Sequence, residues 1–419
     1  MDQSAGTPTH AAASPPTGRV KRRWFRFSLR TLLIFVLLIG SAMGLWWNWE
    51  PWRLERVLGN LGLIGSVDFS PDGGTVIAAG DTEIGGRGVK AWDSATGREL
   101  FELPVVFNLA WPPSSTGDGL LVTVNADYCV ALRDGRTGAV LCSIDTLPQR
   151  IVGVTASPDG RTVATLGDEE AVRFWDTASA RPLWSAPARS NTVFFSPDSR
   201  LVVLAPMEDS AVVFEARTGA RLAVLDPGGT PYAAMFSRDG KAVLTSRWSE
   251  DLKLWNVADG SRVTTFSAKG SFMRFPRVSP DGQLLLVAEP GGTVQTWSAA
   301  TGALCATVQT DDTSSESALC FSPDSRRILV AFHLSSARLW DARDGRPLFT
   351  FTEGPIAECA AFSPDGRRIA MGRKGGGVEM WVKRRDESPF GILILPQFWL
   401  TLLFGSAFVW SVFRDRRTL

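Results

Sequence analysis

Histidine, the side chain most often used for proton transfer and metal binding near neutral pH, is almost absent from this chain. His10 and His333 are the 2 histidines among 419 residues, and His10 precedes the predicted folded region. A Ser-His-Asp triad would have to use His333, and a single histidine in a loop or at a strand end is usually structural. No histidine cluster offers the spacing of a zinc site either. We therefore predict no catalytic residues and no metal site.

The 5 cysteines do not form a recognisable reactive or metal-binding pair. Their number is odd and no two of them form a Cys-x-x-Cys motif, which argues against a zinc site and against a dense disulfide framework. Cys129 and Cys142 fall on adjacent strands of one predicted hairpin. Two interpretations stay open for them, a disulfide in an oxidising compartment or a pair of buried free thiols.

Two glycine-rich stretches have the composition of phosphate-binding loops but not their setting. Glu83–Gly88, with the sequence EIGGRG, lies between predicted strands, and Gly375–Gly377 is typical of a tight turn. A phosphate loop follows a strand and opens a helix, because the helix N-terminus binds the phosphate. We therefore predict no nucleotide and no other cofactor. The formal net charge of +1 gives no attraction to nucleic acid over the chain as a whole.

Short strands that repeat along the chain must position the remaining polar residues. Ser317–Phe351 contains four apolar runs separated by turn sequences such as Ser322–Ser325 and Asp341–Gly345. This pattern predicts a four-stranded antiparallel sheet, which cannot bury both of its faces without neighbours. The turn at Ser322–Ser325 recurs, with a degraded copy at Trp111–Gly119, as Ser70–Gly73, Ser157–Gly160, Ser196–Ser199, Ser237–Gly240 (with Arg238 in place of Pro), Ser279–Gly282 and Ser363–Gly366.

The third predicted strand of each unit ends in an aromatic residue, except in the second unit, where Arg133 takes this place. The aromatic residues are Trp92, Trp175, Phe214, Trp255, Trp297, Trp340 and Trp381. The period of about 42 residues lies in the range of propeller blades. Trp92, Trp175 and Trp340 are each followed by Asp, and with these motifs residues 52–385 resemble the WD40-repeat β-propeller family. This resemblance implies an all-β propeller that binds protein or peptide partners through its loops and does not catalyse a reaction.

The resemblance has one gap, because the Gly-His pair of many such repeats is missing. We expect the blades to be stabilised by aromatic and aliphatic packing instead of a buried polar relay. We predict eight blades, with seven plus one displaced blade as the alternative. The last unit lacks a fourth strand, and Trp52–Gly59 reads as an orphan fourth strand ahead of the first unit. We therefore predict that this segment completes the last blade and closes the ring, which removes exposed sheet edges.

A second class of protein shares some of these motifs. Asp93–Gly97 (DSATG) and Thr301–Gly302 resemble turns that repeat in eight-bladed quinoprotein dehydrogenases. Those repeats usually carry Trp on the fourth strand, a place that only Trp184 fits here. The alternative function is therefore an extracytoplasmic enzyme or a cofactor-binding propeller of quinoprotein type.

Apolar segments flank the predicted propeller. Residues 1–20 read as a disordered tail, and basic residues between Arg19 and Arg30 lead into the apolar run 31–49, which has nearly the length of a bilayer span. A second apolar run covers residues 390–413 and is followed by a basic tail, 414–419. We predict two transmembrane helices, with a cleaved signal peptide as the alternative for 31–49. The basic lead-in resembles the short N-terminal anchors of bacterial membrane proteins, and its charge predicts both termini in the cytoplasm and the propeller outside the inner membrane.

The loops between second and third strands carry an uneven distribution of charge, which predicts a partner site on that face. Acidic residues fall on three consecutive blades, and basic residues fall on the last and first blades, which are neighbours across the closure. The alternative is that these residues are ordinary charged loop residues in contact with solvent and do not form a partner site. The predicted site consists of Asp168, Glu169, Glu170, Glu208, Asp209, Glu250, Asp251, Arg87, Arg373 and Lys374.

Overall fold

The structure is a computed structural model, and its described residues belong almost entirely to the predicted propeller. Residues 33–39 are helical, and no helix among the described residues is long and apolar enough to cross a membrane. Both predicted spans lie outside those residues, except for 33–39 and residue 406. The described ranges are 33–39, 51–82, 86–103, 106–110, 119–125, 127–146, 151–167, 171–187, 190–206, 210–237, 239–247, 252–266, 274–289, 292–309, 316–332, 336–351, 357–383 and 406.

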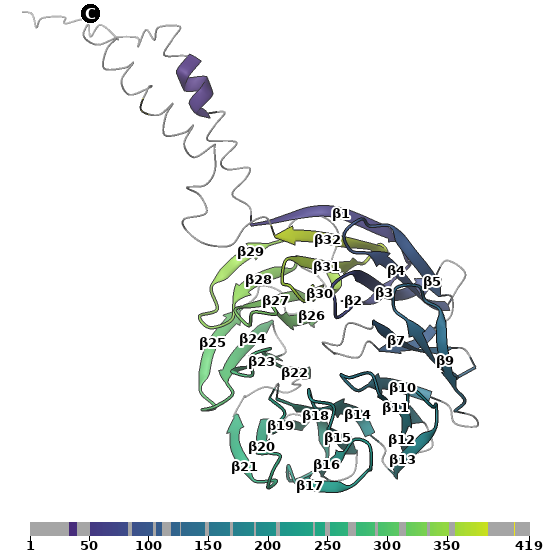
Figure 1. Ribbon diagram of the computed structural model, residues 1–419. Coiled ribbons are helices and arrows are strands. Elements are labelled where there is room, and N and C mark those ends of the chain that lie inside the picture. Colours follow the sequence, from purple (N-terminus) through teal and green to yellow (C-terminus); the bar gives the residue numbers. More distant parts are fainter. Residues whose placement is uncertain are drawn as a thin grey trace, which may run out of the picture. The chain divides into compact units, whose positions relative to one another are not determined.

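Within these ranges the strands form eight four-stranded antiparallel sheets, arranged as a ring around a central axis (Figure 1). Blades 1 to 4 contain β2 (Ile64–Phe69), β3 (Thr75–Thr82), β4 (Gly86–Asp93), β5 (Glu99–Leu103); β6 (Val106–Ala110), β7 (Leu120–Asn125), β8 (Val130–Asp134), β9 (Val140–Ile144); β10 (Ile151–Ala156), β11 (Thr162–Gly167), β12 (Ala171–Asp176), β13 (Pro182–Pro187); β14 (Ser190–Phe195), β15 (Leu201–Pro206), β16 (Ala211–Glu215) and β17 (Arg221–Leu225). Blades 5 to 8 contain β18 (Pro231–Phe236), β19 (Ala242–Arg247), β20 (Leu252–Asn256), β21 (Arg262–Phe266); β22 (Arg274–Val278), β23 (Leu284–Glu289), β24 (Thr293–Ser298), β25 (Leu304–Gln309); β26 (Glu316–Phe321), β27 (Arg327–Phe332), β28 (Arg338–Asp341), β29 (Pro347–Thr350); and β30 (Ala357–Phe362), β31 (Arg368–Arg373), β32 (Gly377–Lys383) with β1 (Trp52–Asn60).

The pairing of β1 with β32 confirms both the eight-bladed ring and its predicted closure. The two strands are antiparallel, with Trp52 opposite Lys383 and Asn60 opposite Gly377. Trp52 is fully buried, and its ring centroid lies 6.2 Å from that of Phe351 in the preceding blade. The first strand of the chain therefore completes a sheet whose other strands come from the end of the folded region.

The Ser-Pro-Asp-Gly turns share one hydrogen-bond network, which confirms that their aspartates form turns. In blade 1 the Ser70 hydroxyl donates to Asp72 at 2.6 Å and accepts the Thr75 N–H at 2.8 Å. Burial opposes ionisation of Asp72, but the bonds from Ser70 and Gly74 and the ion pair with Arg136 outweigh it and lower the pKa to about 2. The same Ser-to-Asp bond occurs in the turns that begin at Ser157, Ser196, Ser237, Ser279, Ser322 and Ser363.

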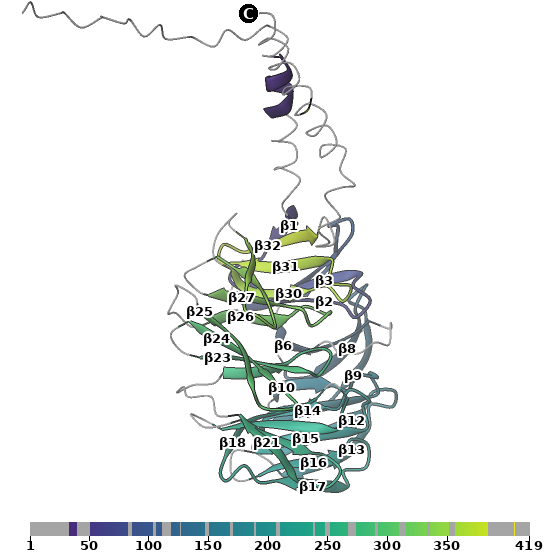
Figure 2. The same ribbon diagram turned by 90° about the vertical axis from the view of Figure 1, so that its left-hand side faces the viewer.

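These turns and the third-to-fourth-strand turns lie together on one face of the ring, which we call the turn face. The Ser94 hydroxyl donates to the Gly73 carbonyl at 2.6 Å, and the Thr177 hydroxyl donates to that of Gly160 at 2.8 Å. In blade 8 the Lys383 N–H occupies the corresponding place and donates to Arg367 O at 2.8 Å. The chain therefore enters the ring at Trp52 and leaves it at Lys383 on the turn face. Figure 2 shows the ring from its side.

Apolar clusters fill the spaces between blades, as expected, and a polar contact recurs within them. Trp175 Nε1 donates to Thr165 Oγ1 at 2.9 Å, and Trp255 Nε1 donates to Thr245 Oγ1 at 2.8 Å. In blade 2 the N–H donor is Arg133 Nε, which lies 3.0 Å from Thr123 Oγ1. This bond explains how an arginine can replace the aromatic residue of the repeat.

In blades 6 and 7 a valine takes the place of the acceptor of this contact. Val287 and Val330 stand ten residues before Trp297 and Trp340, at the position that threonine has in blades 3 and 5. Neither indole N–H has an acceptor among the described residues. A buried donor without a partner costs free energy, so these two tryptophans contribute to stability through packing and not through this hydrogen bond.

The two cysteines of the predicted hairpin are free and half-buried, so the disulfide interpretation is wrong. Cys142 lies opposite Leu132 in the β8–β9 pair, and Cys129 precedes β8. The register therefore separates the two thiols along the strands.

Removing β1 should destabilise the whole ring. A chain that begins at Leu61 loses the burial of Trp52 and Leu58 and leaves β32 with an unpaired edge, at a cost of roughly 3–6 kcal/mol for the two side chains. We expect aggregation or a much lower melting temperature than for a chain that begins at Glu50, measured by circular dichroism. Equal melting of the two chains would contradict the closing role of β1.

Replacing Thr165 with valine tests the tryptophan contact. Thr165→Val should lower the free energy of unfolding by about 1–2 kcal/mol, because the buried Trp175 N–H loses its acceptor. In a Trp175→Phe background the same substitution should cost much less, since no donor remains. Urea unfolding of the four variants measures the coupling, and additive effects would show that the bond contributes nothing.

Candidate functional site

The predicted charged site lies on the face opposite the turn face, and the structure describes part of it. Arg87 and Lys374, at hairpins between second and third strands, are exposed. Arg87 lies directly opposite Asp81 in the β3–β4 register, which places an acid next to this basic residue. The acidic residues lie outside the described residues, so their clustering stays a prediction. They are Asp168, Glu169, Glu170, Glu208, Asp209, Glu250 and Asp251.

Arg373 is not part of this surface, and its predicted role as a partner-binding loop residue is wrong. It is 2% exposed at the end of β31, and its Nη2 lies 2.5 Å from Glu379 Oε2. Trp381 Nε1 donates to the same carboxylate oxygen at 2.9 Å. Blade 8 has Met371 where blade 3 has threonine, so Glu379 supplies the acceptor for Trp381. Arg373 neutralises this buried carboxylate, because an unpaired buried charge would be costly.

Charged residues also meet at the first strands, which are the innermost strands of the blades (Figure 1). Asp68 on β2 and Arg277 on β22 both act electrostatically on the thiol of Cys320 on β26. Burial by the surrounding strands raises the pKa of Asp68 to about 6, although a hydrogen bond from the Phe69 N–H lowers it. The Asp68 side chain is nonetheless exposed to solvent.

The chemistry of this inner cluster is limited. Burial raises the pKa of the Cys320 thiol to about 12, so the thiol is protonated near neutral pH and is a poor nucleophile. Among the described residues no group of three or more His, Cys, Asp or Glu side chains could hold a metal ion. The cluster combines an acid and an arginine without a reactive partner.

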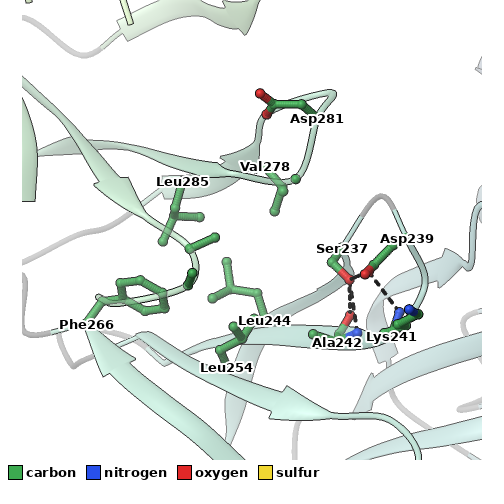
Figure 3. Close-up of a pocket in the computed structure, with 13 residues that line it drawn as sticks. Ser237, Asp239, Lys241, Ala242, Leu244, Leu254, Phe266, Val278, Asp281 and Leu285 are labelled. Carbon is green, nitrogen blue, oxygen red and sulfur yellow. Dashed lines mark hydrogen bonds between the residues drawn. The ribbon is translucent and has the colours of Figure 1, made fainter. Parts of the chain in front are cut away.

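A cavity of about 220 Å³ opens on the turn face between blades 5 and 6 (Figure 3). Its apolar lining comes from Leu244, Leu254 and Phe266 of blade 5 and from Val278 and Leu285 of blade 6. Its polar rim comes from Ser237, Asp239 and Lys241 on one side and from Asp281 on the other. A hollow with apolar walls and a few polar groups at its rim is the usual form of a binding site.

Proline fills the corresponding place at other junctions of the ring. A Cβ atom added to Gly240 would lie 3.8 Å from Pro197 Cδ, and one added to Gly366 would lie 3.6 Å from Pro323 Cδ. Pro364 of blade 8 contacts Gly73 of blade 1 in the same way, at 3.4 Å. In blade 5 the sequence has arginine at position 238 where these repeats have proline. Residue 238 lies outside the described residues. Its sequence neighbours Ser237 and Asp239 line the cavity.

The rim carboxylates are ionised near neutral pH. A hydrogen bond from Ser237 and one from the Lys241 N–H lower the pKa of Asp239, against the effect of burial. Burial raises the pKa of Asp281, but bonds from Ser279 and the Gln283 N–H and the charge of Arg343 outweigh it, and the pKa is lowered. The carboxylates therefore carry charge and also stabilise their turns.

Sequence reasoning missed this cavity, because every residue of its lining also reads as an ordinary core or turn residue. The repeats show arginine in place of proline at position 238, which lies between the rim residues Ser237 and Asp239 in the sequence. A single repeat does not reveal how neighbouring blades meet.

One fourth-strand contact resembles the quinoprotein pattern. Trp184 on β13 stacks on Phe174 with ring centroids 3.9 Å apart, and its Nε1 donates to Ala216 O of the next blade at 2.9 Å. A Cβ atom added to Gly219 would lie 2.5 Å from the Trp184 ring, which explains the glycine, whose φ is 74°. Phe101 takes the same position over Gly138. The contact therefore packs blade 3 against blade 4.

Comparison with known proteins supports the WD40-repeat β-propeller family. Nuclear distribution protein PAC1 of Arthroderma otae is 25% identical over 281 residues, which are 63% of this chain and 56% of that protein. Autophagy-related protein 16 of Arabidopsis thaliana is 22% identical over 274 residues, 63% of this chain and 53% of that protein. The chain thus spans about half the length of these curated relatives. No protein-family model matches the chain.

Solved structures agree with the fold. The C-terminal WD40 domain of Sif2 superposes with a TM-score of 0.65 at 16% identity, covering 79% of this chain and 98% of that domain. The computationally designed Ika8 protein has the same TM-score, 0.65, at 19% identity, covering 79% of this chain and 99% of that protein.

Asp68 should make stability depend on pH. Its pKa of about 6 in the folded state lies above its ordinary value of 3.8, so folding takes up a proton and stability falls as pH rises from about 4 to about 6. Asp68→Asn should remove this part of the dependence. Urea unfolding across this pH range measures the effect, with Asp81→Asn as the control on the neighbouring strand. A dependence that is unchanged in Asp68→Asn would contradict the assignment.

Proposed function

We propose that this chain is a membrane-anchored scaffold whose propeller binds a protein or peptide partner and does not catalyse a reaction. The observation that carries this proposal is the closed eight-bladed ring, which presents many short turns and loops on a rigid frame. Loops on such a frame commonly carry binding function. The names of the relatives support an adaptable platform, since they include a nuclear distribution protein, an autophagy-related protein and a small ribosomal subunit protein.

Membrane anchoring is supported by sequence and by connectivity. The apolar runs 31–49 and 390–413 have nearly the length of a bilayer span, and basic residues precede the first of them. The chain enters and leaves the propeller at paired residues, Trp52 and Lys383. We place the propeller outside the bacterial inner membrane and both termini in the cytoplasm.

The charged loops opposite the turn face are the proposed site for a partner of complementary charge. Reversing the charge of Asp168, Glu169 and Glu170 should weaken capture of the partner by crosslinking in intact membranes, without lowering the melting temperature. The matched control reverses the charge of Arg161 and Arg200, which are exposed on the turn face and contribute only their backbone to the turn bonds. Unchanged capture with the loop variant, together with loss in the control, would move the site to the turn face.

Topology provides a separate test of the anchoring. Protease added to cells with a permeabilised outer layer should digest the propeller, because both termini are placed in the cytoplasm and the propeller outside. Lysed cells show that the propeller can be cleaved, and a cytoplasmic marker shows that the inner membrane is intact. Full protection of the propeller in the intact cells would overturn the proposed orientation.

A further inference from the structure

We propose that Asp68 and Arg277, on the inner strands of blades 1 and 6, form a binding site for a small zwitterionic molecule of the amino-acid class. The carboxylate of the ligand would bind the Arg277 guanidinium, and its ammonium group would bind the Asp68 carboxylate. The site lies on the innermost strands of the ring (Figure 1), apart from the charged loops proposed above. It goes beyond the proposed function, since it does not depend on a protein partner.

The two residues occupy the same position in their blades, two residues before the serine that begins the turn. Asp68 is opposite Ile77 in the β2–β3 pair. Arg277 is opposite Leu286, the equivalent residue of the β22–β23 pair. The other five blades with a serine turn have uncharged residues at this position, namely Thr155, Phe194, Met235, Cys320 and Ala361. Asp68 and Arg277 are therefore the two charged residues at this level of the seven blades that share the turn.

Short uncharged side chains lie between the two charges. In the order of the ring, blades 7 and 8 separate Arg277 from Asp68, and they have Cys320 and Ala361 at the same level. Their inner strands are in contact, since Cys320 Sγ lies 3.9 Å from Ala360 O, and β30 packs in turn against β2. Both charges act electrostatically on the Cys320 thiol, in agreement with its place between them. A positive and a negative group with a short uncharged gap between them complement a small zwitterion.

Both charged groups are accessible, and the described part of the fold does not neutralise them. The two side chains are exposed, and neither forms an ion pair with a described residue. The Asp68 carboxylate accepts one hydrogen bond, from the Phe69 N–H at 2.8 Å. Arginine binds a carboxylate through two parallel hydrogen bonds, so Arg277 supplies the group that recognises the negative end of the ligand. Asp68 supplies the group that recognises the positive end.

The charge of Asp68 opposes folding, which favours a functional reason for it. Burial by the inner strands raises its pKa to about 6, so its ionised form is less stable in the folded chain than in the unfolded chain. The fold does not need this charge, because Thr155 and Met235 occupy the same position in other blades. Acids with a raised pKa and a nearby opposite charge are typical of functional sites. A bound ammonium group would stabilise the ionised carboxylate.

Calorimetric titration of the purified full-length chain tests the proposal at pH 8, where Asp68 is ionised. The zwitterionic probes are free alanine, 4-aminobutyrate and 6-aminohexanoate, which differ in the distance between their charges. Butyrate and butylamine each carry one charge and are the matched controls. We expect at least one zwitterion to bind about tenfold or more tightly than both controls, since it engages both charged groups. A smaller advantage, or no binding of any zwitterion, would overturn the proposal.

Variants that remove one charge locate the binding. In Asp68→Asn the advantage of the best zwitterion over butyrate should disappear, and in Arg277→Gln its advantage over butylamine should disappear, because each variant leaves one of the two contacts. Asp81→Asn and Arg161→Gln are the matched controls and should keep the affinity. Neither Asp68→Asn nor Arg277→Gln should lower the melting temperature, whereas a purely structural role of the two charges would lower it. Unchanged affinity in both variants would overturn the site.

A third variant fills the gap between the charges without changing either of them. Ala361→Met should weaken the best zwitterion about tenfold or more, because the longer side chain occupies the space between the two charged groups. The melting temperature should be kept, since Met235 stands at the equivalent position of blade 5. Unchanged affinity in Ala361→Met would contradict a ligand that spans the gap. The loop-charge variant should keep this affinity whether or not it captures a partner, so the two proposals can fail separately.

Discussion

The pairing of β1 with β32 is the contact on which the rest of the ring depends, because it joins the beginning and the end of the folded region in one sheet. A propeller blade buries its faces only against its neighbours, so a missing outer strand in blade 8 would also expose the faces of blades 7 and 1. The aromatic contacts of Trp52 with Phe351 and Phe362 show this link directly, since they join the closing strand to residues of two blades. Closure also fixes the place where the terminal segments leave the ring.

Much of this architecture could be predicted because it is repeated. The turn at Ser322–Ser325 and its copies gave the strand order, and the unmatched strand at Trp52–Gly59 gave the closure. Arg133 could be placed because its neighbours in the repeat were clear, although its bond to Thr123 could not be foreseen. The flanking spans are a different case, since their evidence is composition and length, which describe a segment but not its contacts.

The candidate sites were harder to predict, for reasons that Arg373 and the cavity illustrate. Arg373 reads as a loop residue because its sequence neighbours are Lys374 and glycines. Arg373 is buried because it pairs with Glu379 on the next strand, and this carboxylate takes the acceptor role that threonine has in blades 3 and 5. The cavity likewise arises from a relation between two blades that are each ordinary. Single-repeat patterns define what a residue does inside its blade, whereas binding surfaces form between blades.

This distinction bears on where a repeated fold acquires function. Eight similar sheets provide eight similar junctions, and a partner can distinguish one of them only where the repeat is broken. Asp68 and Arg277 on the inner strands also depart from the repeat. The Cys320 thiol near them is protonated near neutral pH and is a poor nucleophile. Trp184 departs from the repeat on the outer strand of blade 3, but its indole ring packs against Ala216 and Gly219 of the next blade. The cavity between blades 5 and 6 is the remaining departure, because its apolar lining lies beside ionised carboxylates of the turn face.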